Sequence, residues 1–293
     1  MLYIALKIEI VFIINWMVLH IMKIGIIPNT AKDKDFNVTR DIVSWLFERN
    51  IDVLLEDKIA EELNCSYCGC DLKTIYSFCD IVIVLGGDGT ILNIARQSSE
   101  YNVPIFGINL GHLGFLAEAE KNDMYTALEK ILIGEYFIEK RMMLEASVEE
   151  NDTQIKRFIA LNDIGITKGN FSRIISFSVF INDKFVDLYS ADGIFVSTPT
   201  GSTAYSLSAG GPIVSPDVNV IIITPICPHT LHSRSIIVSE KDTVKVEICD
   251  NNTEVMLTVD GQHGYLLKPN ETVTIRSSSC ITNLVKLKQR SFF

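Results

Sequence analysis

A continuous run of branched apolar residues, Ile81 to Leu85, is followed directly by the segment 86–90, which reads GGDGT. A run without polar alternation predicts a strand buried on both faces, as in a parallel sheet covered by helices. Ligands bind in such sheets at the carboxyl ends of the strands. Adjacent glycines at that place allow a sharp turn and bring backbone N–H groups close to phosphate oxygens. The segment therefore predicts an α/β fold with an anion-binding loop that opens a helix.

A carboxylate at position 88 needs an explanation, because it repels the anion that such a loop binds. Asp88 could hold a divalent metal or accept the proton of an attacking hydroxyl group. It could also serve only as a local turn residue, but its position between a buried strand and a helix favours a chemical role. Thr90 is expected to cap the helix predicted over Thr90–Gln97.

The rest of the first 140 residues alternates between strand and helix patterns, which predicts an open, mostly parallel α/β sheet. Strands are expected at Met22–Ile27, Ile51–Leu55 and Pro104–Ile108, and helices at Asn37–Asn50 and Met124–Ile133. Beyond about residue 140, short strands separated by turn residues predict a β-rich, sandwich-like second domain. One of these strands is expected at Lys156–Ile166, and the helix of this half at Ser202–Ala209.

We expect four parts: an apolar leader (1–21), an α/β domain (22–140), a β-rich domain (141–280), and a C-terminal segment (281–293) that packs back on the first domain. The uncharged run from Ile10 to Leu19 is shorter than the ~20 residues that span a bilayer. Lys7 is the one basic residue before it, and no small-residue cleavage site follows. We expect Met22 to be the physiological start, with a membrane anchor as the alternative.

The net charge of −10, from 26 basic and 36 acidic residues, disfavours a role in coating nucleic acid. No membrane partner is expected. An anionic substrate would have to be held by local groups. Seven cysteines, an odd number, predict reduced thiols in the cytoplasm. Cys65, Cys68 and Cys70 could bind a metal, but no second ligand pair stands at a recognised spacing, which favours an incidental cluster. The same reasoning favours ordinary loop histidines at His112, His229 and His232.

A hydroxyl-rich segment at 197–212, STPTGSTAYSLSAGGP, follows a predicted strand that begins after Asp192. It offers many donors and acceptors to sugar hydroxyls, and Tyr205 offers a ring to pack on a base or ribose. No Walker A lysine follows the glycine loop. The first strand leads into Pro28 without the glycine fingerprint of hydride-transfer enzymes, so an oxidoreductase is disfavoured.

The chain from Met22 to about Lys288 resembles the bacterial NAD kinases. GGDG alone is shared with diacylglycerol and sphingosine kinases and 6-phosphofructokinases, whereas GSTAY together with the Asn-Asp pair is far more specific. The segments that carry the resemblance are 86–90 (GGDGT), 107–116 (GINLGHLGFL), 141–144 (RMML), 161–163 (LND), 197–212, 224–229 (TPICPH) and 259–262 (VDGQ).

The resemblance implies transfer of the γ-phosphoryl group of ATP, another nucleoside triphosphate or polyphosphate to the 2′-hydroxyl of the adenosine ribose of NAD, giving NADP. It implies Asp88 as the catalytic carboxylate and Mg²⁺ or another divalent metal held mainly by the donor phosphates. The implied phosphate-binding residues are Gly86, Gly87, Gly89 and Thr90. The implied NAD-binding residues are Asn162, Asp163, Asp192, Thr200, Thr203, Ala204, Tyr205, Ser208 and Cys227.

In this implied site, Asp163 reaches the ribose and Asp192 meets the nicotinamide end. The family also implies a cytoplasmic homodimer or homotetramer. Asp163 stands where many members have Glu, and Ser235 replaces a common proline. Two alternatives are a lipid kinase with the same glycine loop and a non-catalytic NAD or NADP sensor. The GSTAY segment argues against the first, and the carboxylate of Asp88 against the second.

Overall fold

The computed structural model of the chain describes residues 22–111, 114–151, 153–169, 173–230, 232–249 and 253–288. The expected leader, His112 and the last five residues lie outside the described residues. The chain divides into two compact units. Unit 1 consists of residues up to 91 together with 103–135, and unit 2 consists of residues 92–102 and 136 onward. Each is described separately below.

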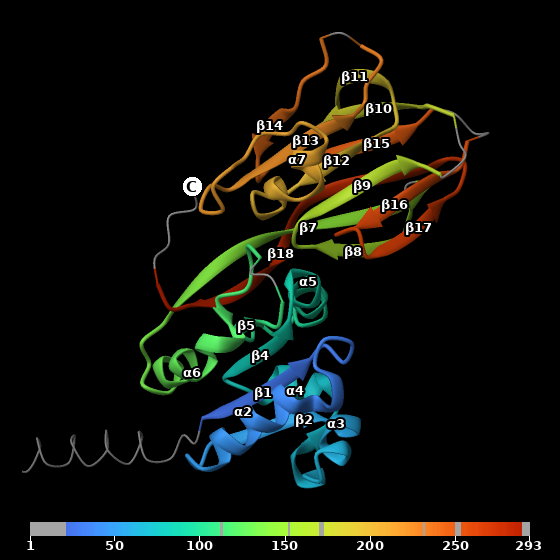
Figure 1. The fold of residues 1–293 in the computed structure, drawn as a ribbon. Helices are drawn as coiled ribbons and strands as arrows, with labels where there is room; N and C mark the ends of the chain where they lie inside the picture. The colour runs from blue at the N-terminus through green and yellow to red at the C-terminus, as the bar shows by residue number, and fades with distance from the viewer. Residues whose placement is uncertain are drawn as a thin grey trace, which may run out of the picture. The chain divides into compact units, whose positions relative to one another are not determined.

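Unit 1 contains the predicted parallel sheet (Figure 1). Its strands lie in the order β5-β4-β1-β2-β3, and every neighbouring pair is parallel. Their bounds are β1 Lys23–Pro28, β2 Asp52–Glu56, β3 Gly69–Cys70, β4 Ile81–Gly86 and β5 Ile105–Asn109, and β6 (Ala119–Glu120) pairs with β5. All six residues of β4 are buried, as the unbroken apolar run predicts.

The helices of unit 1 pack beside this sheet (Figure 1). They are α2 Asn37–Phe47, α3 Asp57–Glu62, α4 Leu72–Phe78 and α6 Met124–Leu132, with short 3₁₀ turns η1 Lys34–Phe36, η2 Ser66–Cys68 and η3 Lys121–Asp123. The helix α5 (Asp88–Gln97) begins in unit 1, and its residues from 92 onward belong to unit 2. The start of α2 is held by the buried carboxylate of Asp33, which accepts hydrogen bonds from the N–H groups of Val38 and Thr39. A side-chain acceptor at this end supplies partners to donors that lack one within the helix.

Unit 2 is a sandwich of two antiparallel sheets. The first contains β11-β10-β15-β18 in that order, with β7 paired to β18 and β8 paired to β7. The second has the order β14-β13-β12-β9-β16-β17. The strands are β7 Phe137–Glu150, β8 Thr153–Ala160, β9 Asp163–Lys168, β10 Ile175–Ile181, β11 Lys184–Ala191, β12 Gly193–Ser197, β13 Val220–Ile226, β14 Ile236–Ser239, β15 Val244–Ile248, β16 Val255–Val259, β17 His263–Leu267 and β18 Glu271–Lys286. The predicted fold class, an α/β part and a β-rich part, is confirmed.

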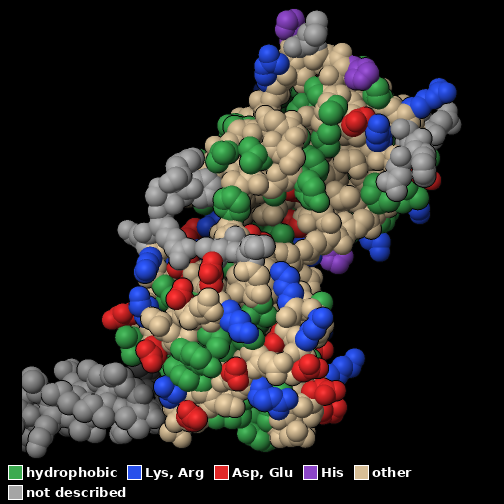
Figure 2. All heavy atoms as spheres, viewed as in Figure 1, with side chains coloured by type: hydrophobic (Ala, Val, Ile, Leu, Met, Phe, Trp, Pro, Cys, Tyr) green, Lys and Arg blue, Asp and Glu red, His purple; other side chains and the backbone are tan. Residues whose placement is uncertain are grey.

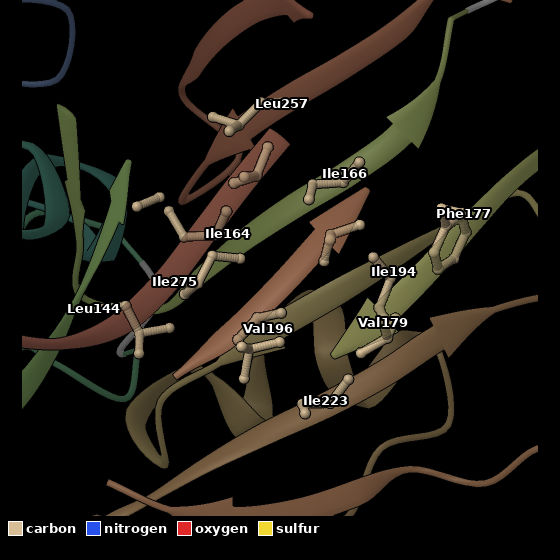
Figure 3. Close-up of a cluster of buried hydrophobic side chains, with 14 of the residues drawn as sticks. Leu144, Ile164, Ile166, Phe177, Val179, Ile194, Val196, Ile223, Leu257 and Ile275 are labelled. Atoms are coloured by element: carbon tan, nitrogen blue, oxygen red, sulfur yellow. The ribbon is translucent and has the colours of Figure 1, made fainter. Parts of the chain in front are cut away.

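The core of unit 2 lies between its two sheets (Figure 3). One sheet contributes residues such as Leu144, Phe177 and Ile275, and the other contributes Ile166 and Val196. These side chains come from alternate positions along their strands, because successive residues of a strand point to opposite faces. Burial of this apolar surface is the main favourable contribution to the stability of the sandwich.

Two predictions about the local structure of unit 2 were wrong. The single strand expected at Lys156–Ile166 is interrupted at Leu161 and Asn162, which separate β8 from β9. The N–H groups of Leu161, Asn162 and Asp163 donate to a side chain distant in the sequence, that of Asp260, instead of continuing a strand. The helix expected over Ser202–Ala209 is also divided.

The 3₁₀ turn η4 (Thr200–Thr203) and the helix α7 (Tyr205–Ser208) are separated by Ala204. Ala204 has φ −95° and ψ −132°, which is outside the helical region. Thr200 and Ser202 are buried whereas Tyr205 is exposed. The segment is therefore a bent connection with one anchored end and one end that faces solvent.

The surface of unit 1 carries both charge signs. Basic and acidic side chains are interspersed on the face of unit 1 that Figure 2 shows, so this face has no extended basic stripe. Hydrophobic side chains gather on the visible face of unit 2. Within the described part of the chain, no helix has the length and apolar character required to cross a membrane.

Replacing Phe177 by Ala is expected to lower the free energy of unfolding of unit 2 by about 3–5 kcal/mol, because the fully buried ring leaves a cavity between the sheets. Phe185→Ala is the matched control, because Phe185 is 61% exposed. Urea unfolding followed by far-UV circular dichroism measures both. Equal effects for the two variants would contradict the position of the core described above.

Candidate functional site

The glycine loop lies at the carboxyl edge of the sheet in unit 1, where the adjacent strands β5, β4 and β1 end. The helix after it begins at Asp88, two residues earlier than predicted. Thr90 is therefore in the first turn and is not the cap, and its N–H donates to the carbonyl of Gly87. Its side-chain oxygen accepts a hydrogen bond from the amide of Asn29, which follows β1. Thr90 thus joins the ends of two neighbouring strands.

Backbone N–H groups hold the carboxylate of Asp88 in place. One oxygen accepts from the N–H of Phe115 at 2.8 Å, and the other accepts from Leu116 and Ala117 at 3.3 and 3.4 Å. A Cβ atom at Gly114 would collide with this carboxylate, so only glycine leaves room for it. The loop after β5 therefore fixes the direction of the Asp88 side chain at the N-terminus of α5.

A lysine that the sequence analysis did not single out lies over the glycine loop. A Cβ atom at Gly87 would be 2.7 Å from Nζ of Lys32 and 4.0 Å from Oδ1 of Asn109. The segment that carries Lys32 is ordered by Asn29, whose side-chain oxygen accepts hydrogen bonds from the N–H groups of Ala31 and Lys32. A cation and the N-terminus of a helix, which favours anions, are thus close together at this edge. A lysine shortly after a strand on the same sheet edge was the signal that could have identified it.

In unit 2, the corner between β8 and β9 packs closely against the loop after β12. The hydroxyl of Thr198 donates to the carbonyl of Leu161 at 2.6 Å and accepts from the N–H of Gly201 at 3.0 Å. A Cβ atom at Gly201 would collide with the backbone of Asn162. The Asn-Asp pair and the hydroxyl-rich loop were predicted from separate motifs. In the structure they are in direct contact and form one site.

The ring of Tyr205 is fixed on one side and accessible on the other. It stacks on Phe195 with ring centroids 5.7 Å apart and an angle of 11° between the planes. A Cβ atom at Gly261 would be 2.5 Å from Cε2 of this ring. Tyr205 nevertheless remains 53% exposed. An aromatic face in this position can stack on a planar ligand.

Asp163 is the unusual carboxylate of unit 2. It is 1% exposed, and neither of its carboxylate oxygens has a hydrogen-bond partner among the described residues. Burial and, second, the charge of Asp260 raise the pKa of Asp163 to about 7. The backbone N–H of Tyr205, which approaches the carboxylate without completing a hydrogen bond, opposes the shift. A buried carboxylate without partners is costly to the free protein. This cost indicates a group whose partner is a ligand.

The remaining predicted residues fall into two groups. Thr200 and Thr203 lie on η4, Ser208 lies on α7 and Ala204 lies between them, so all four are close in sequence to Tyr205. The buried guanidinium of Arg141 anchors this segment by donating to the Thr200 hydroxyl at 3.1 Å, and it also pairs with Glu139.

Asp192 and Cys227 belong to the second group, at the other end of the same sheet. Asp192 precedes β12 and forms an ion pair with Lys168 at 2.7 Å, and Cys227 follows β13. Asp163 and Lys168 begin and end β9, so they are about 17 Å apart at 3.3 Å per residue. Within unit 2 the structure therefore does not bring Asp192 and Cys227 together with Asp163.

No group of three or more His, Cys, Asp or Glu side chains suited to a metal ion occurs in the described ranges. Cys65 and Cys68 are buried at η2, and Cys70 is in β3. Burial raises the pKa of all three thiols, that of Cys68 to about 11. His229 and His232 are exposed.

Asp163→Asn is expected to stabilise the free protein more at pH 8 than at pH 5.5. The folded pKa of about 7 exceeds the unfolded value, so the parent loses stability as the pH rises from about 4 to about 7, and the neutral Asn does not. At about 1.4 kcal/mol per pH unit, the advantage of the variant grows by about 2 kcal/mol between these two pH values. Urea unfolding at both pH values measures it.

Asp123→Asn is the control for this pH comparison, because Asp123 is exposed and its side chain makes no capping hydrogen bond at the start of α6. A variant of Asp163 whose stability advantage is independent of pH would show that the carboxylate is ionised in the same range as in the unfolded chain.

Comparisons with known proteins identify the family. Residues 24–136 match the ATP-NAD kinase N-terminal domain, and residues 161–287 match the ATP-NAD kinase C-terminal domain. The chain is 52% identical over 271 residues to an NAD kinase of Thermoanaerobacter sp. strain X514, covering 92% of this chain and 96% of the relative. It is 44% identical over 270 residues to an NAD kinase of Natranaerobius thermophilus, covering 92% and 94%.

Solved structures extend the similarity to the fold. Yeast NADH kinase complexed with NADH matches with a TM-score of 0.84 and 26% identity, over 93% of this chain and 85% of the yeast chain. An NAD kinase from Archaeoglobus fulgidus in complex with ATP matches with a TM-score of 0.71 and 25% identity, over 92% and 94%. Both parts of the chain, and the motifs that form its two candidate sites, lead to the same conclusion: the chain belongs to the NAD kinase family.

Proposed function

We propose that the chain transfers the γ-phosphoryl group of ATP to the 2′-hydroxyl of the adenosine ribose of NAD, giving NADP and ADP. Family membership and relatives named NAD kinase at up to 52% identity support this activity. Among the structural neighbours, the yeast enzyme is complexed with NADH and the archaeal enzyme with ATP.

The observation that carries the proposal is the fixed carboxylate of Asp88 at the start of α5. In the proposed reaction the 2′-oxygen forms a bond to the γ-phosphorus, the bond between that phosphorus and the β-γ bridging oxygen breaks, and Asp88 accepts the hydroxyl proton. Such general-base assistance typically contributes ~10²–10⁴-fold. The hydrogen bonds from Phe115, Leu116 and Ala117 support this role by fixing the carboxylate direction before substrate binds.

The donor phosphates are proposed to lie against the glycine loop, near Gly86, Gly87, Gly89 and Thr90. Lys32 would then supply positive charge above Gly87. In phosphoryl transfer a divalent ion bridges the donor phosphates and neutralises developing charge. Because the described residues form no three-ligand metal group, the phosphates would supply most ligands of Mg²⁺ or a similar ion. The same loop could accept another nucleoside triphosphate or polyphosphate.

The acceptor NAD is proposed to bind in unit 2. Asn162 and Asp163 would bind the adenosine half, with the unpartnered carboxylate of Asp163 on a ribose hydroxyl. The exposed face of Tyr205 would stack on a ring of the dinucleotide. The other residues proposed for this site are Thr200, Thr203, Ala204 and Ser208, and Asp192 with Cys227 for the nicotinamide end.

We further propose the domain organisation implied by the motifs: an α/β domain over 22–140 that carries the phosphate loop and a β-rich, NAD-binding domain over 141–280. The family resemblance extends the proposal to a cytoplasmic homodimer or homotetramer. All seven cysteines are free thiols, which suits a reducing compartment. Light scattering coupled to size-exclusion chromatography measures the assembly.

Asp88→Asn is expected to lower kcat by about 10²–10⁴-fold, because the amide cannot accept the hydroxyl proton. NADP formation from NAD, ATP and Mg²⁺ is measured through a coupled NADP-specific dehydrogenase. Calorimetric titration with NAD is the control, and it should give the same affinity for variant and parent. A parent that binds NAD without turnover with ATP or polyphosphate would instead identify a sensor.

Lys32→Met is expected to raise the KM for ATP by about tenfold or more, which corresponds to about 1.4 kcal/mol, because a cation near the donor phosphates is lost. The KM for NAD should change less than twofold. Lys34→Met, two residues away in η1, is the matched control and should leave both constants unchanged. Equal effects of the two variants on the KM for ATP would contradict a role of Lys32 in binding the donor phosphates.

A further inference from the structure

The carboxylate of Asp260 holds the corner between β8 and β9. Its Oδ1 atom accepts from the N–H groups of Asn162 at 2.7 Å and Asp163 at 3.1 Å, and its Oδ2 atom accepts from Leu161 at 3.2 Å. The side chain of Asp260 is completely buried, and its φ of +49° places it in the left-handed region. Successive backbone N–H groups that point at one anion are called a nest. Here the bound anion is the carboxylate of Asp260, a residue of the same chain.

Arg96 balances the buried charge of Asp260. Its Nη1 donates to Oδ2 of Asp260 at 2.7 Å, and the Arg96 side chain is only 8% exposed. Its Nη2 donates to the side-chain oxygens of Gln262 and Asn93. Arg96 lies in the last turn of α5, in the part of that helix that belongs to unit 2. Without this cation, the buried charge of Asp260 would be unpaired, which would strongly destabilise the folded protein.

The nest determines where the neighbouring side chains point. Once the N–H groups of Asn162 and Asp163 are directed at Asp260, the strand hydrogen bonds of β8 cannot continue through them, and the chain turns into β9. The carbonyl of Asn162 then accepts from the N–H of Thr198, which fixes the other side of the corner. Asp163 is left with its carboxylate buried and unpartnered.

We propose that Asp260 and Arg96 are positioning residues of the dinucleotide site: Asp260 holds the Asn162–Asp163 backbone in its binding conformation, and Arg96 holds Asp260. This inference rests on the proposed function, because it assigns the Asn-Asp corner to NAD. Neither residue needs to touch the dinucleotide, since each acts through the backbone of the corner.

The pH dependence of NAD binding can distinguish a positioning role of Arg96 from a role in stability alone, because Arg96 acts on the charge next to Asp163. The charge of Asp260 raises the pKa of Asp163, and the Arg96 guanidinium is hydrogen-bonded to Asp260. Removal of this cation would leave the charge of Asp260 unbalanced, so we expect the pKa of Asp163 to rise further. Asp260, on the turn after β16, is the charged group that faces Asp163. The backbone N–H of Tyr205 at the start of α7 also acts on Asp163, while the guanidinium of Arg141 is engaged by Thr200 and Glu139.

The experiment compares the full-length parent with Arg96→Met, Arg96→Lys and Asp260→Asn. NAD binding is measured by calorimetry between pH 6 and pH 9, and the KM values for NAD and ATP by the coupled assay. Arg157→Met is the control, because Arg157 pairs with Glu145 elsewhere in unit 2. Circular dichroism verifies that each variant is folded.

Arg96→Met is expected to weaken NAD binding tenfold or more and to move the midpoint of its pH dependence upward by about half a unit or more. Arg96→Lys keeps the charge, so its midpoint should stay near that of the parent while affinity falls severalfold. Asp260→Asn should move the midpoint downward. The KM for ATP should change less than twofold in all variants, and Arg157→Met should match the parent.

An Arg96→Met variant that is less stable but keeps the NAD affinity and the pH midpoint of the parent would overturn the inference. If Arg96→Met does not fold, Arg96→Lys provides the test. An NAD affinity of Arg96→Lys equal to that of the parent would contradict the positioning role of Arg96. A parent that binds NAD but forms no NADP contradicts the proposed activity alone. The calorimetric comparison still tests the inference in that case.

Discussion

The structure of unit 2 depends on where three consecutive N–H groups find their acceptor. Those of Leu161, Asn162 and Asp163 are directed at the carboxylate of Asp260, which lies 97 or more residues later in the chain. Buried N–H groups require partners, so the position of this carboxylate decides where β8 ends and β9 begins. The hydroxyl-rich loop after β12 then packs on the corner through Thr198 and Gly201.

Asp88, Asp163 and Asp260 have the same side chain but differ in the number of hydrogen bonds that their carboxylates accept. Asp88 accepts from three N–H groups of the loop after β5, yet it stands at a helix N-terminus on the edge where three parallel strands end. Asp260 accepts from three N–H groups and one guanidinium and is fully engaged. Asp163 accepts from no described residue. Satisfied carboxylates orient structure, whereas an unsatisfied buried carboxylate has a strong requirement for a hydrogen-bond donor.

In the proposed NAD site, this requirement links the stability of the free protein to ligand binding by Asp163. The free protein bears the cost of burying a carboxylate whose pKa is raised to about 7. A ligand hydroxyl that enters the site would satisfy the group and recover part of that cost on binding. Local violations of the rules for stable packing are expected at sites that bind ligands. The buried core between the sheets of unit 2 supplies the stability that allows the violation.

Local patterns in the sequence determined the parts of the molecule that depend on neighbouring residues. The apolar run at β4, the glycine loop after it and the alternation of strands and helices predicted the α/β unit, and the short strands predicted the β-rich unit. The motifs also identified Asp88, the Asn-Asp pair and Tyr205. These features follow from backbone geometry and side-chain periodicity within a few residues.

Only the tertiary structure decided the features that depend on partners distant in the chain. The break at Leu161 and Asn162, the division of the predicted helix at Ala204 and the placement of Lys32 over Gly87 arise from contacts with other segments. The same holds for the ion pair between Arg96 and Asp260, which are 164 residues apart. A hydrogen bond or a burial energy depends on distance in space, and sequence periodicity carries no information about which distant side chain will be near.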